Sequence, residues 1–254
     1  MTTIGVTLLS GGLDSTIVST YARNQVDHLT ALTFHYGQTH SKEIKSAEDI
    51  SQILGIHHKL VDISSFKEVA WFSSLTNPDR FPIPQDRFQQ LLDDKTQSTR
   101  TDVPSTYVSL RNTFLLVVAG AFLESEALFS IESDGMSPQD ITTTLFIAPN
   151  AIDYSGYPDC RPEYYDAIRE TMMRGSKLWT QYKIAIEIET PIIHLTKAEI
   201  VRMGIELNAP LAHTWSCYQG DDLPCGRCDS CILRAKGFEE AGISDPLSTR
   251  LGTG

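Results

Sequence analysis

Apolar positions in the first quarter of the chain alternate between short continuous runs and stretches with helical periodicity. Residues 4–9 form a short apolar run, and residues 29–35 and 59–63 are rich in β-forming side chains, so each predicts a strand. Between Ser41 and Leu54 the apolar residues recur at helical spacing, and Gly55 follows as a stop signal. Because strands and helices alternate over short links, the pattern predicts a parallel sheet with helices on both faces.

The pattern is less regular in the second half of the chain, where polar segments separate the apolar runs. We expect an apolar helix over 114–124, buried strands over 128–131 and 145–148 with a polar loop over 132–143 between them, a helix over 161–174, a strand over 184–190 and a helix from 196 to about 207. The last helix opens with Thr196-Lys197-Ala198-Glu199, which has the form of a capping box. Together these elements predict an α/β fold with a doubly wound, mostly parallel sheet.

Residues from about 64 to 104 interrupt this alternation. They are rich in proline and predict a long insertion rather than a regular element. We place the insertion over the C-terminal edge of the sheet, where α/β proteins bind their ligands. The chain is therefore expected to contain an α/β domain over residues 1–190, which carries the insertion, and a C-terminal helical segment over residues 191–254.

Length, composition and charge narrow the classes of protein. A chain of 254 residues fits one large domain, or one domain with an appendage. Its 41% hydrophobic and 21% charged residues are ordinary for a soluble protein, and no apolar run approaches the ~20 residues of a membrane span. The first residues lack the basic region of a signal peptide, so we expect a cytoplasmic protein without a membrane partner. The net charge of −11 favours a small-molecule substrate over a nucleic acid.

The stretch Ser10-Gly11-Gly12-Leu13-Asp14-Ser15 joins the first predicted strand to a predicted helix over 16–22. Adjacent glycines let the backbone turn sharply and bring N–H groups close to a ligand, the serine hydroxyls add donors, and a helix N-terminus favours an anion. The stretch lacks the lysine of a Walker loop and the spacing of G-x-G-x-x-G. It predicts a pyrophosphate cradle, and it matches S-G-G-x-D-S, the signature of the PP-loop ATP pyrophosphatase superfamily. We expect ATP to bind there through Leu9, Ser10, Gly11, Gly12, Leu13, Asp14, Ser15 and Thr16.

Four of the five cysteines lie close together near the C-terminus, in the pattern C-x7-C-x2-C-x2-C: Cys217, Cys225, Cys228 and Cys231. Closely spaced cysteines in a cytosolic chain favour a metal over disulfides. Four thiolates without an open position are typical of structural Zn2+, which we expect here, with an iron–sulfur cluster as the alternative. Cys160 stands apart, and we expect it to be a small buried side chain.

Several stretches of the chain together resemble one family. Besides the glycine-rich hexapeptide and the cysteine tail, the matching stretches are TYVSLRNT at 106–113, DYSGYPDCR at 153–161 and LTKAEI at 195–200. The chain is similar to the 7-cyano-7-deazaguanine synthases, the QueC-type branch of the PP-loop superfamily, from its N-terminus to about Pro246. The resemblance implies a Rossmann-like fold of the adenine nucleotide alpha hydrolase type, with a small zinc-binding helical appendage.

The resemblance implies a reaction in two stages on 7-carboxy-7-deazaguanine. The carboxylate attacks the α-phosphate of ATP, and ammonia displaces AMP from the acyl adenylate to leave an amide. The amide oxygen is adenylated in turn, and loss of AMP yields the nitrile. This chemistry implies a ligase that forms C–N bonds, with ATP and Mg2+ beside the structural Zn2+. It belongs to the biosynthesis of queuosine or related 7-deazaguanines, and family members are expected to be homodimers.

The resemblance also implies roles for individual residues. Asp14 and Ser15 would be catalytic together with Arg111 and Lys197; Asp14 suits Mg2+ or loop orientation, and Arg111 suits a phosphate or the substrate carboxylate. Lys197 opens a helix, and a solvated surface lysine is its open alternative. The pocket for the base would be formed by Thr106, Asn112, Tyr154, Tyr157, Asp159 and Arg161. There an aromatic face can stack on the base, and Asp159 can accept hydrogen bonds from its guanidine-like edge.

Three alternatives stay open at this point. Ser109-Leu110 stands where the family has Pro-Gly or Pro-Ala, and Ala148-Pro149 also departs near the expected pocket, so a paralogue that stops at the amide or transfers the acyl group to another acceptor is possible. A PP-loop tRNA-modifying enzyme would show a basic surface and a catalytic cysteine pair outside the metal site, which the charge and the single Cys160 do not favour. A non-catalytic scaffold would bind ATP without releasing pyrophosphate.

Overall fold

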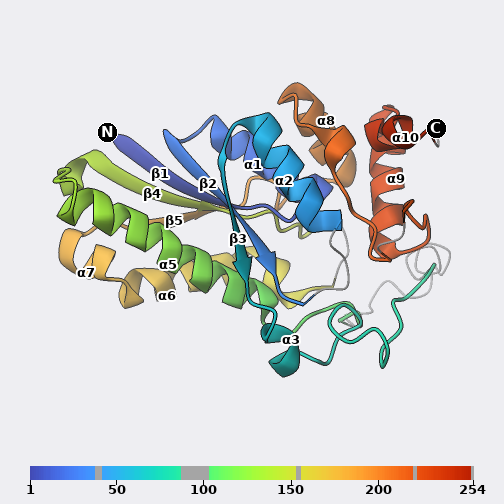
Figure 1. The fold of residues 1–254 in the computed structure, drawn as a ribbon, viewed down its shortest axis with the longest axis horizontal. Helices are drawn as coiled ribbons and strands as arrows, with labels where there is room; N and C mark the ends of the chain where they lie inside the picture. The colour runs from blue at the N-terminus through green and yellow to red at the C-terminus, as the bar shows by residue number, and fades with distance from the viewer. Residues whose placement is uncertain (38–41, 87–102, 153–155, 220–221, 253–254) are drawn as a thin grey trace.

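A computed structural model describes residues 1–37, 42–86, 103–152, 156–219 and 222–252 of the chain. Its centre is a sheet of five parallel strands in the order β3-β2-β1-β4-β5 (Figure 1). The strands are β1 (Thr2–Leu8), β2 (His28–His35), β3 (His57–Asp62), β4 (Ile141–Phe146) and β5 (Ile186–Glu189). The first strand, β1, is the central strand of the sheet. Strands β2 and β3 extend the sheet on one side of it, and β4 and β5 extend it on the other side. This order confirms the predicted doubly wound sheet.

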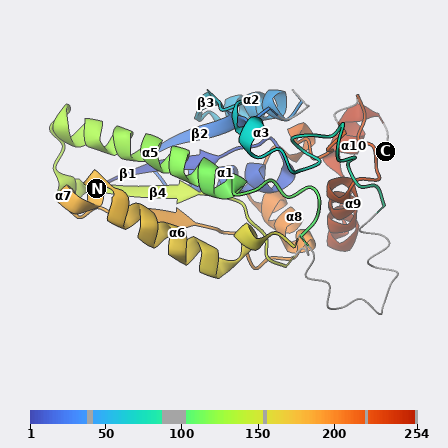
Figure 2. The same cartoon turned by 90° about the horizontal axis from the view of Figure 1, so that it is seen from below.

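Helices cover both faces of the sheet, as the alternating pattern predicts. One face carries α1 (Leu13–Arg23), α2 (Lys42–Leu54) and α8 (Lys197–Glu206), and the other carries α5 (Arg111–Glu132), α6 (Pro162–Gly175) and α7 (Lys177–Tyr182) (Figures 1 and 2). The short α3 (Phe66–Val69) follows β3. Beyond the C-terminal ends of the strands lie α9 (Asp229–Ala241) and α10 (Pro246–Leu251) (Figure 2). The C-terminal helices therefore stand at the edge of the sheet where ligands bind in such folds.

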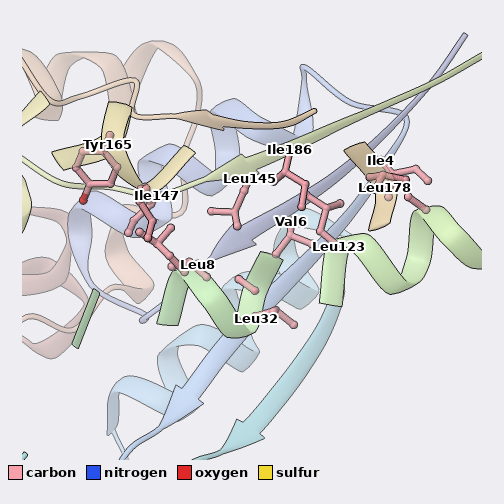
Figure 3. Packing of buried hydrophobic residues seen from close by; sticks show 14 of the residues in the cluster. Ile4, Val6, Leu8, Leu32, Leu123, Leu145, Ile147, Tyr165, Leu178 and Ile186 are labelled. Atoms are coloured by element: carbon pink, nitrogen blue, oxygen red, sulfur yellow. The ribbon is translucent and has the colours of Figure 1, made fainter. Parts of the chain in front are cut away.

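Two apolar clusters hold these layers together. Figure 3 shows the larger one, in which Val6, Leu145 and Ile186 of the strands meet Leu123 of α5 and Leu178 of α7. The opposite cluster contains Ile17, Phe146, Ile200 and Phe238. The central strand β1 is buried on both faces from Ile4 to Leu8, and the buried stretch includes the polar Thr7.

Helix α5 corrects two predictions. Residues 128–131, which we expected to be a strand, form the end of α5, and β4 begins at Ile141, inside the expected loop of 132–143. The buried positions of α5 recur at helical spacing: Leu116, Ala119, Gly120, Leu123 and Ala127. A segment of only four residues is too short to reveal that this periodicity continues through it.

By length and composition α5 could cross a membrane, with a mean hydropathy of 1.8. The expectation that no apolar stretch approaches this length therefore needs correction. The helix packs along β1 and β4, where one face contributes to the larger core. The prediction also missed α7, whose first turn is capped by Ser176 Oγ, which accepts from the N–H of Trp179 at 3.1 Å.

The described parts of the insertion run along the C-terminal edge of the sheet toward α9. The N–H of Ser74 donates to the carbonyl oxygen of Ser105 at 2.8 Å, which ties the beginning of the insertion to its end. The N–H of Asp86 donates to the carbonyl oxygen of Arg227 at 2.9 Å, close to the cysteine cluster. Residues 87–102 lie outside the described residues. The insertion thus connects the end of the sheet to the C-terminal segment.

Candidate active site

The loop between β1 and α1 is shaped by one glycine. Gly11 has a φ of +83°, and a Cβ atom there would lie 2.2 Å from the carbonyl oxygen of Glu43 in α2. The hydroxyl oxygens of Ser10 and Ser15 lie 2.9 Å apart, and the N–H of Gly12 donates to Ser10 Oγ at 3.3 Å. The loop therefore turns tightly at the C-terminal end of the central strand, with the N-terminus of α1 behind it. Such a turn can cradle a phosphate group.

Lys197 contacts this loop from the start of α8. Its Nζ lies 3.0 Å and 2.8 Å from the two carboxylate oxygens of Asp14, and its side chain is only 10% exposed, so it is not a solvated surface lysine. The capping box confirms the predicted helix start, because Thr196 Oγ1 accepts from the N–H of Glu199 and the Glu199 carboxylate accepts from the N–H of Thr196. Gly237 of α9 leaves room for the lysine stem, since a Cβ there would lie 2.3 Å from Lys197 Cγ.

A cavity of about 370 Å3 opens beside the loop, and most of the predicted site residues line it. Its walls come from the ends of β1, β2 and β4, from the first turns of α2, α5 and α8, and from the segment around Trp215 and Tyr218. The cavity therefore lies at the switch point between β1 and β4, where the chain departs in opposite directions. Asp14 and Lys197 mark one end of it.

Arg111 lines the same cavity; we call the wall around it the base end, and the loop with Asp14 and Lys197 the phosphate end. It is the first residue of α5, and its guanidinium carbon lies 5.8 Å from the ring centre of Tyr36. Burial by itself lowers the pKa of Arg111, but Tyr36, Tyr157 and Asp159 raise it above its ordinary value. Arg111 therefore stays charged within a largely aromatic wall, where a guanidinium binds a carboxylate or phosphate strongly.

The other residues predicted for the base pocket do not all reach the cavity. Asn112 and Tyr157 line it, whereas Thr106 lies behind Tyr157 and shares a hydrogen bond of 2.7 Å with the Tyr157 hydroxyl. Arg161 is exposed at the start of α6 and does not line the cavity. Tyr154 lies outside the described residues.

Asp159 is buried next to the cavity but does not line it. Burial raises the pKa of its carboxyl, while Arg111 and the backbone N–H of Asn112 lower it. Helix α5 has no side-chain cap from Leu110, which precedes it. Because the carboxyl of Asp159 accepts from a first-turn N–H, it takes over the role of a cap and fixes the start of the helix that carries Arg111.

The four clustered cysteines come together as their spacing predicts. Their sulfur atoms all lie within 4.8 Å of one another, so the four side chains could hold one metal ion. Cys217 Sγ accepts from the N–H groups of Cys225 and Gln219 at 3.3 Å and 3.4 Å. These N–H groups favour the thiolate form, and Gly226 turns the chain between ligands with a φ of +71°. The donor set fits a closed structural metal site.

The cysteine cluster is joined directly to the glycine-rich loop. The N–H of Trp215 donates to the carbonyl oxygen of Gly11 at 2.8 Å, and Trp215 Nε1 donates to the carbonyl oxygen of Cys217 at 3.2 Å. Arg234 of α9 braces the same segment through Thr214 Oγ1 at 2.7 Å and pairs with Asp245. The metal-binding segment and the loop therefore form one continuous hydrogen-bonded unit.

Comparison with known proteins places the chain in a family. A family profile described as "Queuosine biosynthesis protein QueC" matches residues 4–242. The chain belongs to the QueC family. A relative from Thermoplasma volcanium, named 7-cyano-7-deazaguanine synthase, is 41% identical over 244 residues, which cover 95% of this chain and 89% of the relative. One of the same name from Oceanobacillus iheyensis is 37% identical over 243 residues, which cover 95% and 96% of the two chains.

Similarity to solved structures is weak. An NMN synthetase from Francisella tularensis aligns with 100% of this chain and 78% of its own, at a TM-score of 0.38 and 15% identity. The U34-tRNA thiolase NcsA from Methanococcus maripaludis aligns with 99% of this chain and 71% of its own, at a TM-score of 0.39 and 15% identity. Similarities at this level carry no information on what the QueC-family chain does.

One departure from the family pattern is explained by backbone geometry. Leu110 has a φ of +53°, in the left-handed region that glycine adopts freely, and its side chain is exposed. The backbone at this position is therefore one that a glycine would adopt without strain, whereas leucine adopts it at a cost. The second departure from the family pattern, Ala148-Pro149, lies in the wall of the cavity, because both residues line it.

Sequence reasoning missed several cavity residues of this QueC-family protein: Tyr36, Glu43, Trp215, Ser216, Tyr218, Ser230 and Arg234. Glu43 left a signal in the sequence, because it falls on the same helical stripe as Ala47, Ile50 and Leu54. A carboxylate in the first turn of a helix, on the same face as its apolar residues, is directed toward the protein interior and not toward solvent. The aromatic residues left no comparable signal, since nothing in their local pattern separates a cavity wall from a core.

The environment of Glu43 is unusual for a carboxyl group. Burial raises its pKa to about 7, although the Arg111 charge opposes this and Cys217 adds to it. Among the residues that the structure describes, no ion pair within 4.0 Å joins Glu43 to Arg111. The cavity thus presents a carboxyl and a guanidinium that attract each other without touching.

Proposed function

We propose that this QueC-family protein is a cytoplasmic, homodimeric ligase that converts 7-carboxy-7-deazaguanine and ammonia to 7-cyano-7-deazaguanine. Each of the two stages consumes one ATP and releases AMP and pyrophosphate. The observation that carries the proposal is one cavity whose wall has two chemically different parts. A phosphate-type loop and a buried guanidinium both line it, so a nucleotide and an organic acid can meet there.

The loop supports the nucleotide half of the proposal. The N–H groups at the turn and the N-terminus of α1 would bind the β- and γ-phosphates, which leave as pyrophosphate. Lys197 would place its charge against the same phosphates, and its pairing with Asp14 holds it in position while the cavity is open. Stabilisation of the charge that develops on the leaving group is the main catalytic contribution that we assign to these residues.

Arg111 supports the acid half of the proposal. A guanidinium can hold a carboxylate with two parallel hydrogen bonds and turn one oxygen toward the α-phosphorus atom. Attack by that oxygen breaks the α–β bond and gives the acyl adenylate with pyrophosphate. Ammonia then adds at the acyl carbon, AMP leaves, and one proton goes to solvent. In the second stage the amide oxygen attacks the α-phosphorus atom of ATP and pyrophosphate leaves, and loss of AMP and of both amide protons completes the nitrile.

Two metals belong to the proposal. Mg2+, which screens the phosphate charges when bound, would be held by Asp14 of the loop. The residues fit this role, because Asp14 is a carboxylate beside a phosphate-type turn and lines the cavity. Zn2+ would be held by Cys217, Cys225, Cys228 and Cys231 as a purely structural ion, with an iron–sulfur cluster as the alternative for the same thiolates.

The proposal is tested by mass spectrometry of the products formed from the purified protein with ATP, Mg2+, ammonium and 7-carboxy-7-deazaguanine. The expected result is the nitrile with two AMP and two pyrophosphate per product. Omission of the acid is the control, since AMP formed without it would report uncoupled hydrolysis. Amide alone would show a paralogue that stops halfway, and absence of AMP would overturn the proposal.

A further inference from the structure

Glu43 occupies a position that the reaction steps above do not use. It belongs to the first turn of α2, its backbone oxygen abuts Gly11, and the residue lines the cavity. Glu43 is half-buried, and the surrounding protein raises the pKa of its carboxyl to about 7. A poorly hydrated carboxylate that faces a cavity gains most from a ligand that brings hydrogen-bond donors.

The proposed substrate carries such donors on one edge. The ring of a 7-deazaguanine has an N–H and an adjacent amino group, which together match the two oxygens of a carboxylate. The neighbouring carbonyl and the carboxylate substituent are acceptors and match a guanidinium. A base of this kind therefore needs both a carboxylate and a guanidinium, and Glu43 and Arg111 line the same cavity.

The carboxylates available for this contact are few. Among the described residues that line the cavity, only Asp14 and Glu43 are acidic. Asp14 is paired with Lys197 at the phosphate end. Asp159, which the sequence motif favoured for the base, is turned to the N–H of Asn112 and lies outside the cavity wall. This leaves Glu43 as the cavity carboxylate that is not paired with Lys197.

We propose that Glu43 recognises the amino-substituted edge of the 7-deazaguanine base and so sets the specificity for guanine-type over hypoxanthine-type acids. This inference rests on the proposed function, because it assumes that the substrate is a 7-deazaguanine acid. Asp159 is then a positioning residue, which holds the start of α5 and through it Arg111.

The test compares two substrates in three proteins. The substrates are 7-carboxy-7-deazaguanine and the same acid without the amino group, and the proteins are the wild type, Glu43→Gln and Asp159→Asn. AMP release gives kcat/KM for each pair. In the wild type the amino group is expected to favour its substrate by about 100-fold, because the analogue leaves a buried acceptor unpaired. In Glu43→Gln this preference should fall to within about fivefold, since the amide offers one acceptor atom and one donor group and so cannot match two neighbouring donors.

The Asp159→Asn variant distinguishes the role of the Asp159 carboxyl group from that of the Glu43 carboxyl group. It is expected to lower kcat/KM for both acids while the preference for the amino group stays near its wild-type value. A preference that survives in Glu43→Gln, or that disappears only in Asp159→Asn, would overturn the assignment to Glu43. Failure of the wild type to release AMP with either acid would instead overturn the proposed function, so the two failures are distinguishable.

Folding of the variants is checked independently of turnover. Calorimetric binding of a non-hydrolysable ATP analogue with Mg2+ should give the wild-type affinity in Glu43→Gln, because the substitution leaves the backbone oxygen of residue 43, which abuts Gly11, in place. Glu43→Asp provides a second variant. It keeps a carboxylate with a shorter reach, so KM for both acids should rise while the preference for the amino group persists. Loss of that preference in Glu43→Asp together with its persistence in Glu43→Gln would contradict recognition by the carboxylate.

Discussion

The two ends of the cavity are built in different ways. The phosphate end is one continuous hexapeptide at the end of the central strand, and its shape depends on local turns and on hydroxyls within five residues of one another. The base end is assembled from separate segments, with Tyr36 after β2, Glu43 in α2, Arg111 in α5 and Tyr157 before α6. The first can be identified by its sequence, whereas the second exists only once the sheet has formed.

This difference suggests that, in the QueC-family chain, one part of the cavity binds the nucleotide and the other selects the acid. A loop that supplies backbone N–H groups binds any nucleotide phosphate, because it contacts atoms that all nucleotides share. Side chains from distant segments define the identity of the acid. Substitutions at the loop should therefore affect ATP and acid together, and substitutions at the far end should affect the acid alone.

The largest effect is expected at Lys197. Lys197→Met keeps the stem against Gly237 but removes the charge that faces the loop, so kcat should fall by about 1,000-fold through lost stabilisation of the leaving phosphates. Initial rates of pyrophosphate release measure this. Lys236→Met on the outer surface of α9 is the control and should change the rate less than twofold. Equal losses in the two variants would mean that charge in general, not this contact, drives catalysis.

Gly11 tests how rigid the loop is. In Gly11→Ala the new Cβ would lie 2.2 Å from the Glu43 carbonyl oxygen in a backbone with positive φ, so the free energy of unfolding should fall by roughly 3 kcal/mol. Gly55→Ala has a similar φ of +62° with no atom within 4 Å, and should cost only about 1 kcal/mol. Urea denaturation of both variants provides the comparison. Equal losses would show that backbone strain, and not close packing against α2, fixes the loop.

Arg111 tests the far end. Arg111→Lys keeps a positive charge but loses the paired hydrogen bonds, so KM for the acid should rise about 30-fold while KM for ATP stays constant. The exposed Arg161→Lys serves as the matched control, and little change is expected because Arg161 does not line the cavity. A parallel rise in KM for ATP would show that Arg111 contacts the nucleotide, and the division between the two ends would fail.

The smallest effect is expected at Leu110. Leu110→Gly should raise the free energy of unfolding by up to about 1 kcal/mol, because it removes a left-handed backbone strain from an exposed side chain. Leu110→Ala keeps the strain and should give no gain. Thermal denaturation of both variants against the wild type measures the difference. A loss of stability in the glycine variant would mean that the exposed leucine makes a stabilising contact, for example across a dimer.

The comparison also explains what the sequence could predict. The strand-loop-helix unit, the capping box at Thr196 and the cysteine cluster are local patterns, and each appears in the structure where the sequence placed it. The strand expected over 128–131 was wrong because four residues cannot show a period. The contact between Lys197 and Asp14 spans most of the chain, and the cap that Asp159 provides for α5 crosses between elements. Such contacts depend on tertiary structure, which local patterns do not contain.

The hydrogen bond from Trp215 to Gly11 has a thermodynamic consequence. It couples the metal-binding segment to the nucleotide loop, and a coupling free energy between two sites acts equally in both directions. If an ion on the four thiolates tightens the binding of nucleotide, nucleotide must tighten the binding of the ion by the same factor. More chelator would then be needed to remove the metal from the nucleotide-loaded protein at equilibrium, and a remote structural ion would report on the occupancy of the active site.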